Sequence, residues 1–145
     1  MIEIIDEELK GMINNMMQHD LTPFKIYNPG DYENESLVLI ANRDCCLYDH
    51  LLFQVARTDE DLPDHAKSHF LTFDEIDIKA GERVCIYTCR GEDREEIGLH
   101  TGVHYYVVYW NLDAPVWTKH DNEIAIMDRG NSMSVYLNPD RVKKY

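Results

Sequence analysis

Two histidines four residues apart, His65 and His69, come closest in type and spacing to a metal site. On a helix, such a pair places both imidazoles on one face, as zinc binding requires. Asp61 and Asp64 could add oxygen ligands. However, Ala66 stands where a zinc protease has glutamate, and the segment is polar, so a solvated loop is the favoured interpretation. A metal-assisted hydrolase built on these histidines is the alternative with the least support.

The cysteines and glycines do not form a recognised catalytic pattern. Cys45 and Cys46 are adjacent, while Cys85 and Cys89 lie on an expected strand, where four residues span about 13 Å. The chain contains no C-x-x-C motif, no phosphate-binding glycine loop and no nucleophile elbow. We therefore expect four free thiols, a protein that is not an enzyme, and no cofactor.

The densest aromatic segment, residues 105–117, is the best candidate for a binding site. Strand alternation places Tyr106 and Trp110 on one face and Tyr105 and Tyr109 on the other. One set is expected in the core, and the other set could then anchor a partner or stack a sugar. The candidate partner- or ligand-binding residues are Tyr106, Tyr109, Trp110, Asn111 and Asp113.

Composition indicates one acidic globular domain. The 145 residues include 27 Asp and Glu against 14 Lys and Arg, a formal net charge of -13, and 44% are hydrophobic. This charge argues against direct binding to nucleic acid or to an anionic membrane, because both require a basic surface. It favours a basic protein partner, since complementary charge accelerates encounter and selects partners. An inhibitor or immunity protein that masks a basic enzyme is a narrower version of this hypothesis.

The start of the chain does not resemble a secretory leader. It is acidic rather than basic, and the longest apolar runs, such as Leu37–Ala41, have about five residues, too few for a leader or a membrane span. We therefore expect a cytoplasmic protein.

Residues 1–22 are expected to form an amphipathic helix that packs on the rest of the protein. Asp6 is a suitable N-cap, and Pro23 prevents easy continuation. Apolar side chains recur with the helical period at Ile5, Leu9, Met12, Ile13 and Met16.

Residues 24–138 are expected to form an all-β domain, followed by a short basic tail at 139–145. The polar segment from Arg57 to His69 is interpreted as a long loop, with a possible helical turn near Leu62–Lys67. Short β-branched and aromatic runs separated by turns predict a sandwich or barrel. These runs are Leu37–Ala41, Leu51–Ala56, Ile76–Ile78, Val84–Thr88, Val103–Trp110, Ile124–Met127 and Val135–Leu137.

Three segments of this domain carry a family resemblance. The first is Leu39–Asn42 followed by Leu47–Leu52, and the second is Ile78–Thr88. The third joins an aromatic loop to a tryptophan, a strand and an Asp-x-Gly hairpin, at 109–117 and 121–131. Over about residues 35–138 the chain resembles the lamin tail domain. The resemblance implies an immunoglobulin-like antiparallel β-sandwich and a non-enzymatic module for interaction or attachment.

These observations favour a non-enzymatic protein-interaction module with an acidic surface and a basic protein partner. A β-sandwich that binds carbohydrate or another small ligand through the Tyr/Trp strand is the second hypothesis. The third is the metal-assisted hydrolase.

Overall fold

The computed structural model describes residues 19–118, 123–128 and 133–137. The helix expected over residues 1–22 falls almost entirely outside the described residues, as does the basic tail at 139–145. No helix within the described ranges is long and apolar enough to cross a membrane.

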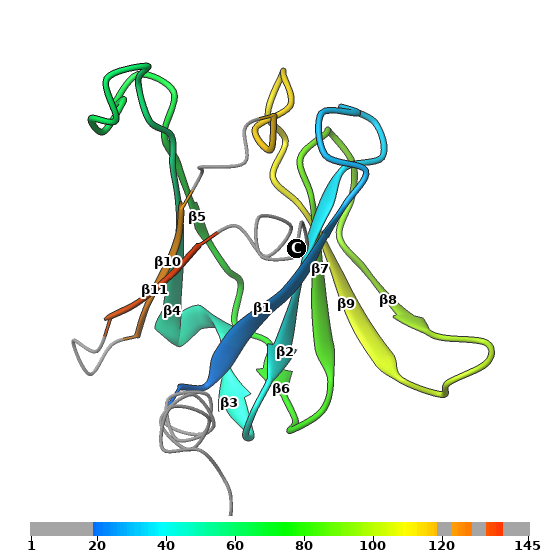
Figure 1. The fold of residues 1–145 in the computed structure, drawn as a ribbon. Helices are drawn as coiled ribbons and strands as arrows, with labels where there is room; N and C mark the ends of the chain where they lie inside the picture. Colours follow the sequence, from blue (N-terminus) through cyan, green and yellow to red (C-terminus); the bar gives the residue numbers. More distant parts are fainter. Residues whose placement is uncertain (1–18, 119–122, 129–132, 138–145) are drawn as a thin grey trace, which may run out of the picture.

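The fold is mainly β, with strands in three sheets, which confirms the expected class (Figure 1). The largest sheet has the order β1-β2-β7-β9-β8 and contains β1 (Leu21–Tyr27), β2 (Ser36–Ala41), β7 (Arg83–Tyr87), β9 (His104–Tyr109) and β8 (Arg94–Ile97). The second sheet has the order β11-β10-β4-β5 and contains β11 (Met133–Leu137), β10 (Glu123–Asp128), β4 (His50–Val55) and β5 (His69–Thr72). The smallest sheet pairs β3 (Cys45–Cys46) with β6 (Asp77–Ile78), and a 3₁₀ turn, η1 (Leu47–Asp49), joins β3 to β4.

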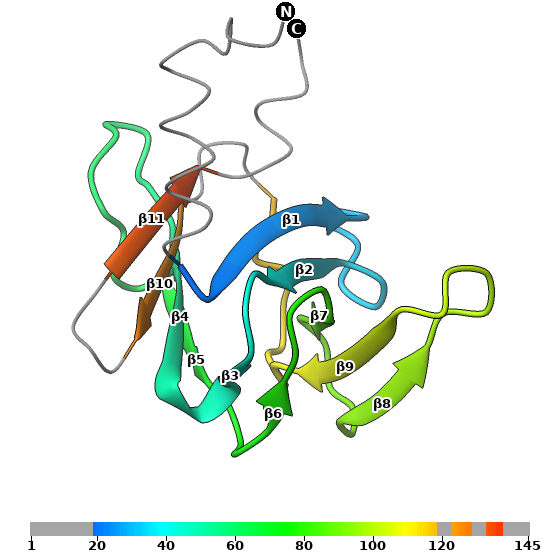
Figure 2. The ribbon, with the colours of Figure 1, turned by 90° about the horizontal axis from the view of Figure 1, so that it is seen from below.

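One strand pair departs from the expected antiparallel arrangement. β7 and β9 are parallel, with Val84 opposite Tyr106 and Ile86 opposite Val108. The reason is the path of the chain, because β8 occupies the sheet edge and β9 returns between β8 and β7 (Figure 2). The other strand pairs described in the three sheets are antiparallel.

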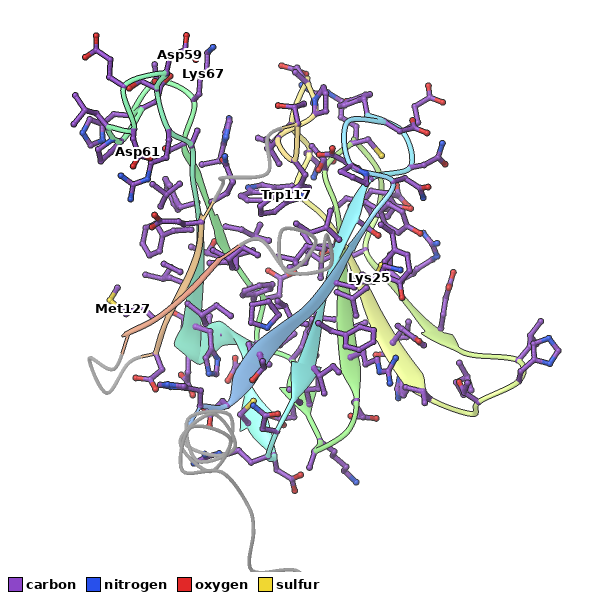
Figure 3. All side chains as sticks on the ribbon, in the orientation of Figure 1. Lys25, Asp59, Asp61, Lys67, Trp117 and Met127 are labelled. Atoms are coloured by element: carbon purple, nitrogen blue, oxygen red, sulfur yellow. The ribbon has the colours of Figure 1, made fainter. Side chains whose placement is uncertain are left out.

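The two larger sheets share one hydrophobic core, which is consistent with the expected sandwich. Strand β7 alternates as predicted, with Val84 and Ile86 buried and Arg83, Cys85 and Tyr87 partly exposed. Trp117 is 2% exposed and points between the two sheets (Figure 3). The inward side chains come from both sheets and include Leu37, Leu39, Val84, Ile86, Val108, Leu52, Ile124 and Ile126.

The first strand begins earlier than expected. β1 starts at Leu21, so Leu21 and Thr22 belong to the sheet rather than to a helix. Pro23 lies within this strand, where the register shifts between Pro23 and Lys25. β1 is an edge strand, so a residue without a backbone N–H can be accommodated there.

The polar segment from Arg57 to His69 is mainly a loop, as predicted. It closes on itself through a bridge between Arg57 and Pro63, and it contains turns at residues 59–60 and 65–67. The edge strands β5 and β8 were not predicted, because their residues are largely polar or exposed and do not show apolar alternation.

Candidate functional site

The five predicted binding residues separate into a buried pair and an exposed group. Tyr106 and Trp110 lie in the core, 9% and 8% exposed. Their polar atoms are used internally, since Tyr106 Oη donates to the Asp77 carbonyl at 3.3 Å and Trp110 Nε1 donates to the Phe70 carbonyl at 3.0 Å. These two residues therefore position the strand and offer little surface to a partner.

Tyr109 belongs to an aromatic surface on the outer side of the largest sheet. It faces Tyr87 in the parallel register, and the two rings stack with centroids 5.3 Å apart. Tyr105 lies four residues earlier on the same side of β9. We call this surface the tyrosine face, and it comprises Tyr87, Tyr105, Tyr109, Arg83 and Arg94.

Arginines fix the rings of the tyrosine face. Arg94 Nη1 donates to Tyr109 Oη at 2.6 Å, and its guanidinium lies 5.7 Å from the centre of that ring. This hydrogen bond, with a second one to Glu96, raises the pKa of Arg94. Arg83 lies 5.9 Å from the Tyr105 ring centre and 5.2 Å from that of Phe24. Burial raises the pKa of Tyr87 above its ordinary value.

Asn111 and Asp113 support one end of the tyrosine face. Asn111 adopts a positive φ of 59° and its side-chain oxygen accepts from Gly91 N at 3.0 Å. Asp113 accepts from Arg90 Nε at 3.0 Å. Gly91 lies against Tyr109, where an added Cβ would fall 2.4 Å from the ring. A pocket of about 480 Å³ opens here, lined by Tyr32, Glu33, Asn34, Tyr87, Cys89, Arg90, Arg94 and Tyr109.

A larger pocket, of about 620 Å³, lies beside the sheet that contains β4 and was not predicted. Leu51 faces Met127 on one side and Thr72 on the other in the strand register, so these three side chains form one row. Met127 points away from the core (Figure 3). We call this the acidic pocket, and its further lining residues are Tyr48, Asp49, His50, Phe73, Asp74, Glu75 and Asp128.

Four carboxylates surround this partly apolar floor. Asp49 comes from η1, Asp74 and Glu75 follow β5, and Asp128 ends β10. No lysine or arginine is among the described residues that line it. Such a site can accept a cationic side chain, with the aliphatic stem on the floor and the charge among the carboxylates. Sequence reasoning missed the pocket because its acidic residues come from three separate segments.

The two candidate metal histidines are not brought together as a site. His65 is exposed in the turn at 65–67. His69 lies in β5, where Nδ1 is 3.0 Å from Gln54 Oε1 and the ring packs edge-on against Trp110. Because the segment does not form a helix, their spacing no longer places both imidazoles on one face.

A different group of potential ligands lies at the start of β1, β3 and β4. Asp20, Cys45 and His50 each contribute one ligand atom, and the three atoms lie within 4.8 Å of one another. Burial raises the pKa of the Cys45 thiol to about 12, and the nearby Asp20 carboxylate adds to the effect. Each of the four cysteines is a free thiol, as expected from the sequence.

Comparison with known proteins gave no relative: no protein-family model matches the chain, and no curated protein matches it significantly.

Proposed function

We propose that this protein is a non-enzymatic interaction module that binds a basic protein partner. The observation that carries the proposal is the acidic pocket, in which Asp49, Asp74, Glu75 and Asp128 surround a floor that includes Leu51 and Met127. The favoured occupant is a lysine or arginine side chain of the partner.

Charge and shape both support this occupant. The net charge of -13 attracts a basic protein over a distance, which raises the association rate at low salt. Within the pocket, the exposed Tyr48 ring offers an aromatic surface for the cation, while the apolar floor covers the stem. Long-range charge therefore favours encounter, and the pocket favours a particular side chain.

The resemblance to the lamin tail domain supports the same proposal. We propose that the two larger sheets form an immunoglobulin-like β-sandwich of this type. The first segment that carries the resemblance includes the end of β2, the second includes β7, and the third includes β10. Domains of this kind serve as modules for interaction or attachment, and the free thiols fit the cytoplasmic location that we propose.

The test compares two double variants with the same change in net charge. Asp74→Asn with Glu75→Gln removes charge at the pocket, whereas Asp59→Asn with Asp61→Asn removes it on the distant exposed loop (Figure 3). The probes are fluorescent hexa-arginine and hexa-lysine peptides, with binding measured by anisotropy. We expect the pocket variant to weaken binding about 10-fold, equivalent to about 1.4 kcal/mol, and the loop variant to have a much smaller effect.

Equal losses in the two double variants would show that the peptides respond to overall charge alone. Absence of binding by the unaltered protein would also contradict the proposal. Amide chemical shifts for Thr72 and Met127 provide an independent map of the contact, because both residues line the pocket.

The tyrosine face supports a second candidate function, the binding of a carbohydrate or another small ligand. The Tyr87–Tyr109 stack beside the pocket of about 480 Å³ resembles the aromatic platforms on which flat ligands bind. A glycan array would test it, with Tyr109→Ala expected to lose any signal and Tyr48→Ala, in the acidic pocket, expected to keep it.

A further inference from the structure

Asp20, Cys45 and His50 are brought together from three segments at one end of the fold. Asp20 precedes β1, Cys45 begins β3, and His50 begins β4. Their ligand atoms are a carboxylate oxygen, a thiol sulfur and an imidazole nitrogen, all within 4.8 Å of one another. This combination of atoms is typical of zinc sites in proteins.

His50 is oriented as metal-binding histidines are. Its side chain is 2% exposed, and Nδ1 lies 2.9 Å from the Cys46 carbonyl oxygen. A carbonyl only accepts hydrogen bonds, so Nδ1 carries the proton and donates it. A ligand histidine commonly uses one nitrogen for a backbone carbonyl and presents the other to the metal. Here the other nitrogen, Nε2, points to Asp20 Oδ2 at 2.9 Å.

Hydrogen bonds and an ion pair also hold Asp20 in position. Arg43 Nε lies 3.2 Å from Asp20 Oδ1, which leaves Oδ2 directed at His50. The Asn42 backbone N–H donates to the Asp20 carbonyl at 2.7 Å, and the Asn42 side chain donates to the His19 carbonyl at 2.9 Å. These contacts fix the backbone and the carboxylate of Asp20 relative to His50.

We propose that Asp20 Oδ2, Cys45 Sγ and His50 Nε2 bind one zinc ion, with the fourth position open to water. In a tetrahedral zinc site with these ligands, the ligand atoms lie roughly 3.3–3.6 Å apart. The present separations, 2.9 Å for the oxygen and nitrogen and up to 4.8 Å within the group, need only small side-chain shifts to reach that geometry. The proposal goes beyond partner binding and is tested without any partner.

The competing interpretation is a hydrogen-bonded His50–Asp20 pair beside an unrelated thiol. The two interpretations differ in whether Cys45 participates, since an ion pair has no need of the sulfur. The experiment therefore monitors the sulfur directly.

The full chain, kept reduced with a phosphine and freed of metal by a chelator that is then removed, is titrated with Co²⁺ and then with Zn²⁺. We expect the d–d absorption of tetrahedral cobalt together with a thiolate-to-cobalt charge-transfer band, saturating at one ion per chain. Zn²⁺ should abolish both bands and raise the Tm by several degrees, because it binds the folded state. A chain that shows no thiolate band contradicts the proposal.

Cys45→Ser and Cys46→Ser form a matched pair. Adjacent strand residues point to opposite sides, and the Cys46 carbonyl that orients His50 is kept in its serine variant. We expect Cys45→Ser to lose the charge-transfer band and to bind Zn²⁺ at least about 10-fold more weakly, while Cys46→Ser retains both properties. A band that persists in Cys45→Ser assigns the metal to another cysteine and overturns the site.

Asp20→Asn gives a second comparison that does not alter a cysteine. It keeps the shape of the side chain but removes the anionic ligand, and we expect weaker Zn²⁺ binding with the thiolate band still formed at higher Co²⁺ concentration. Unchanged Zn²⁺ affinity in this variant would exclude Asp20 from the site.

Discussion

At the residue scale, Glu35 holds three loops together at one end of the fold. The side chain is 0% exposed and accepts hydrogen bonds from Gly30 N at 2.9 Å, from Val116 N at 2.9 Å and from Thr88 Oγ1. A carboxyl group has enough acceptor positions for all three donors, which explains why a buried acidic residue is tolerated here.

We predict that Glu35→Ala lowers the free energy of unfolding by about 2–4 kcal/mol, because it leaves buried donors without an acceptor. Urea denaturation measures the change. Glu33→Ala, at an exposed position two residues earlier, is the control and should change the value by less than about 0.5 kcal/mol. Similar values for the two variants would contradict the role given to Glu35.

A pH effect follows from Cys45. Its pKa is raised from 9.0 to about 12 in the folded state, chiefly by burial, so between these pH values the unfolded chain loses the thiol proton while the folded chain retains it. Stability must therefore decrease as pH rises through this range. We predict that, without metal, the free energy of unfolding of Cys45→Ala decreases less with rising pH than that of the unaltered protein.

Denaturation at a series of pH values from 8 to 11 measures this difference. Cys89→Ala is the control for the removal of one cysteine. Cys45 comes after β2 and Cys89 comes after β7, and because these two strands are antiparallel, the two cysteines lie toward opposite ends of the sheet. Parallel alkaline curves for the unaltered protein and Cys45→Ala would show that Cys45 is not the cause.

At the element scale, the largest sheet combines well-buried central strands with an exposed edge. β2 is buried along almost its whole length, whereas each residue of β8 is exposed and pairs with β9 on one side. The charged side chains of β8 also discourage pairing with another chain. The hairpin tip beyond it carries Leu99, which is 97% exposed.

We predict that the amides of β8 exchange with deuterium at least roughly 100-fold faster than those of β2, since local opening energies rise from near zero at exposed edges to the global value in the core. Native-state exchange followed by NMR measures both strands in one sample. Comparable protection would indicate that β8 opens together with the central strands.

At the scale of the whole molecule, Trp117 joins the two larger sheets. It is 2% exposed and its ring lies 6.5 Å from that of Trp110. We predict that Trp117→Ala lowers the free energy of unfolding by about 3–5 kcal/mol, the usual cost of removing a large buried aromatic side chain.

Thermal and urea denaturation measure this loss. Leu99→Ala, which also shortens an apolar side chain but at an exposed tip, should stay within about 0.5 kcal/mol of the unaltered protein. If Trp117→Ala were as stable as the unaltered protein, Trp117 would not be central to the core.

Most of the fold could be predicted from the sequence, because the alternation of apolar and polar residues along a strand indicates which side chains share a buried face. The runs at Val84–Thr88 and Val103–Trp110 became β7 and β9, and the period of two correctly placed Tyr106 and Trp110 on one face. Only the structure showed that this face is the buried one. β1 was missed because the helical pattern before it and Pro23 within it obscured a strand. β8 was missed because an edge strand with both faces exposed has no apolar pattern to detect.

The sequence by itself determined the mainly β class, the loop that begins at Arg57, the acidic charge and the division of the β9 tyrosines between two faces, because each depends on local pattern or on composition. Which of these faces is exposed was decided by the packing of the two sheets. The tertiary structure alone decided the parallel β7–β9 pair, the acidic pocket and the cluster of Asp20, Cys45 and His50. These features join side chains or strands from distant segments, and no local period encodes which segments meet. Packing of the sheets around one core sets those distances, and the site chemistry follows from them.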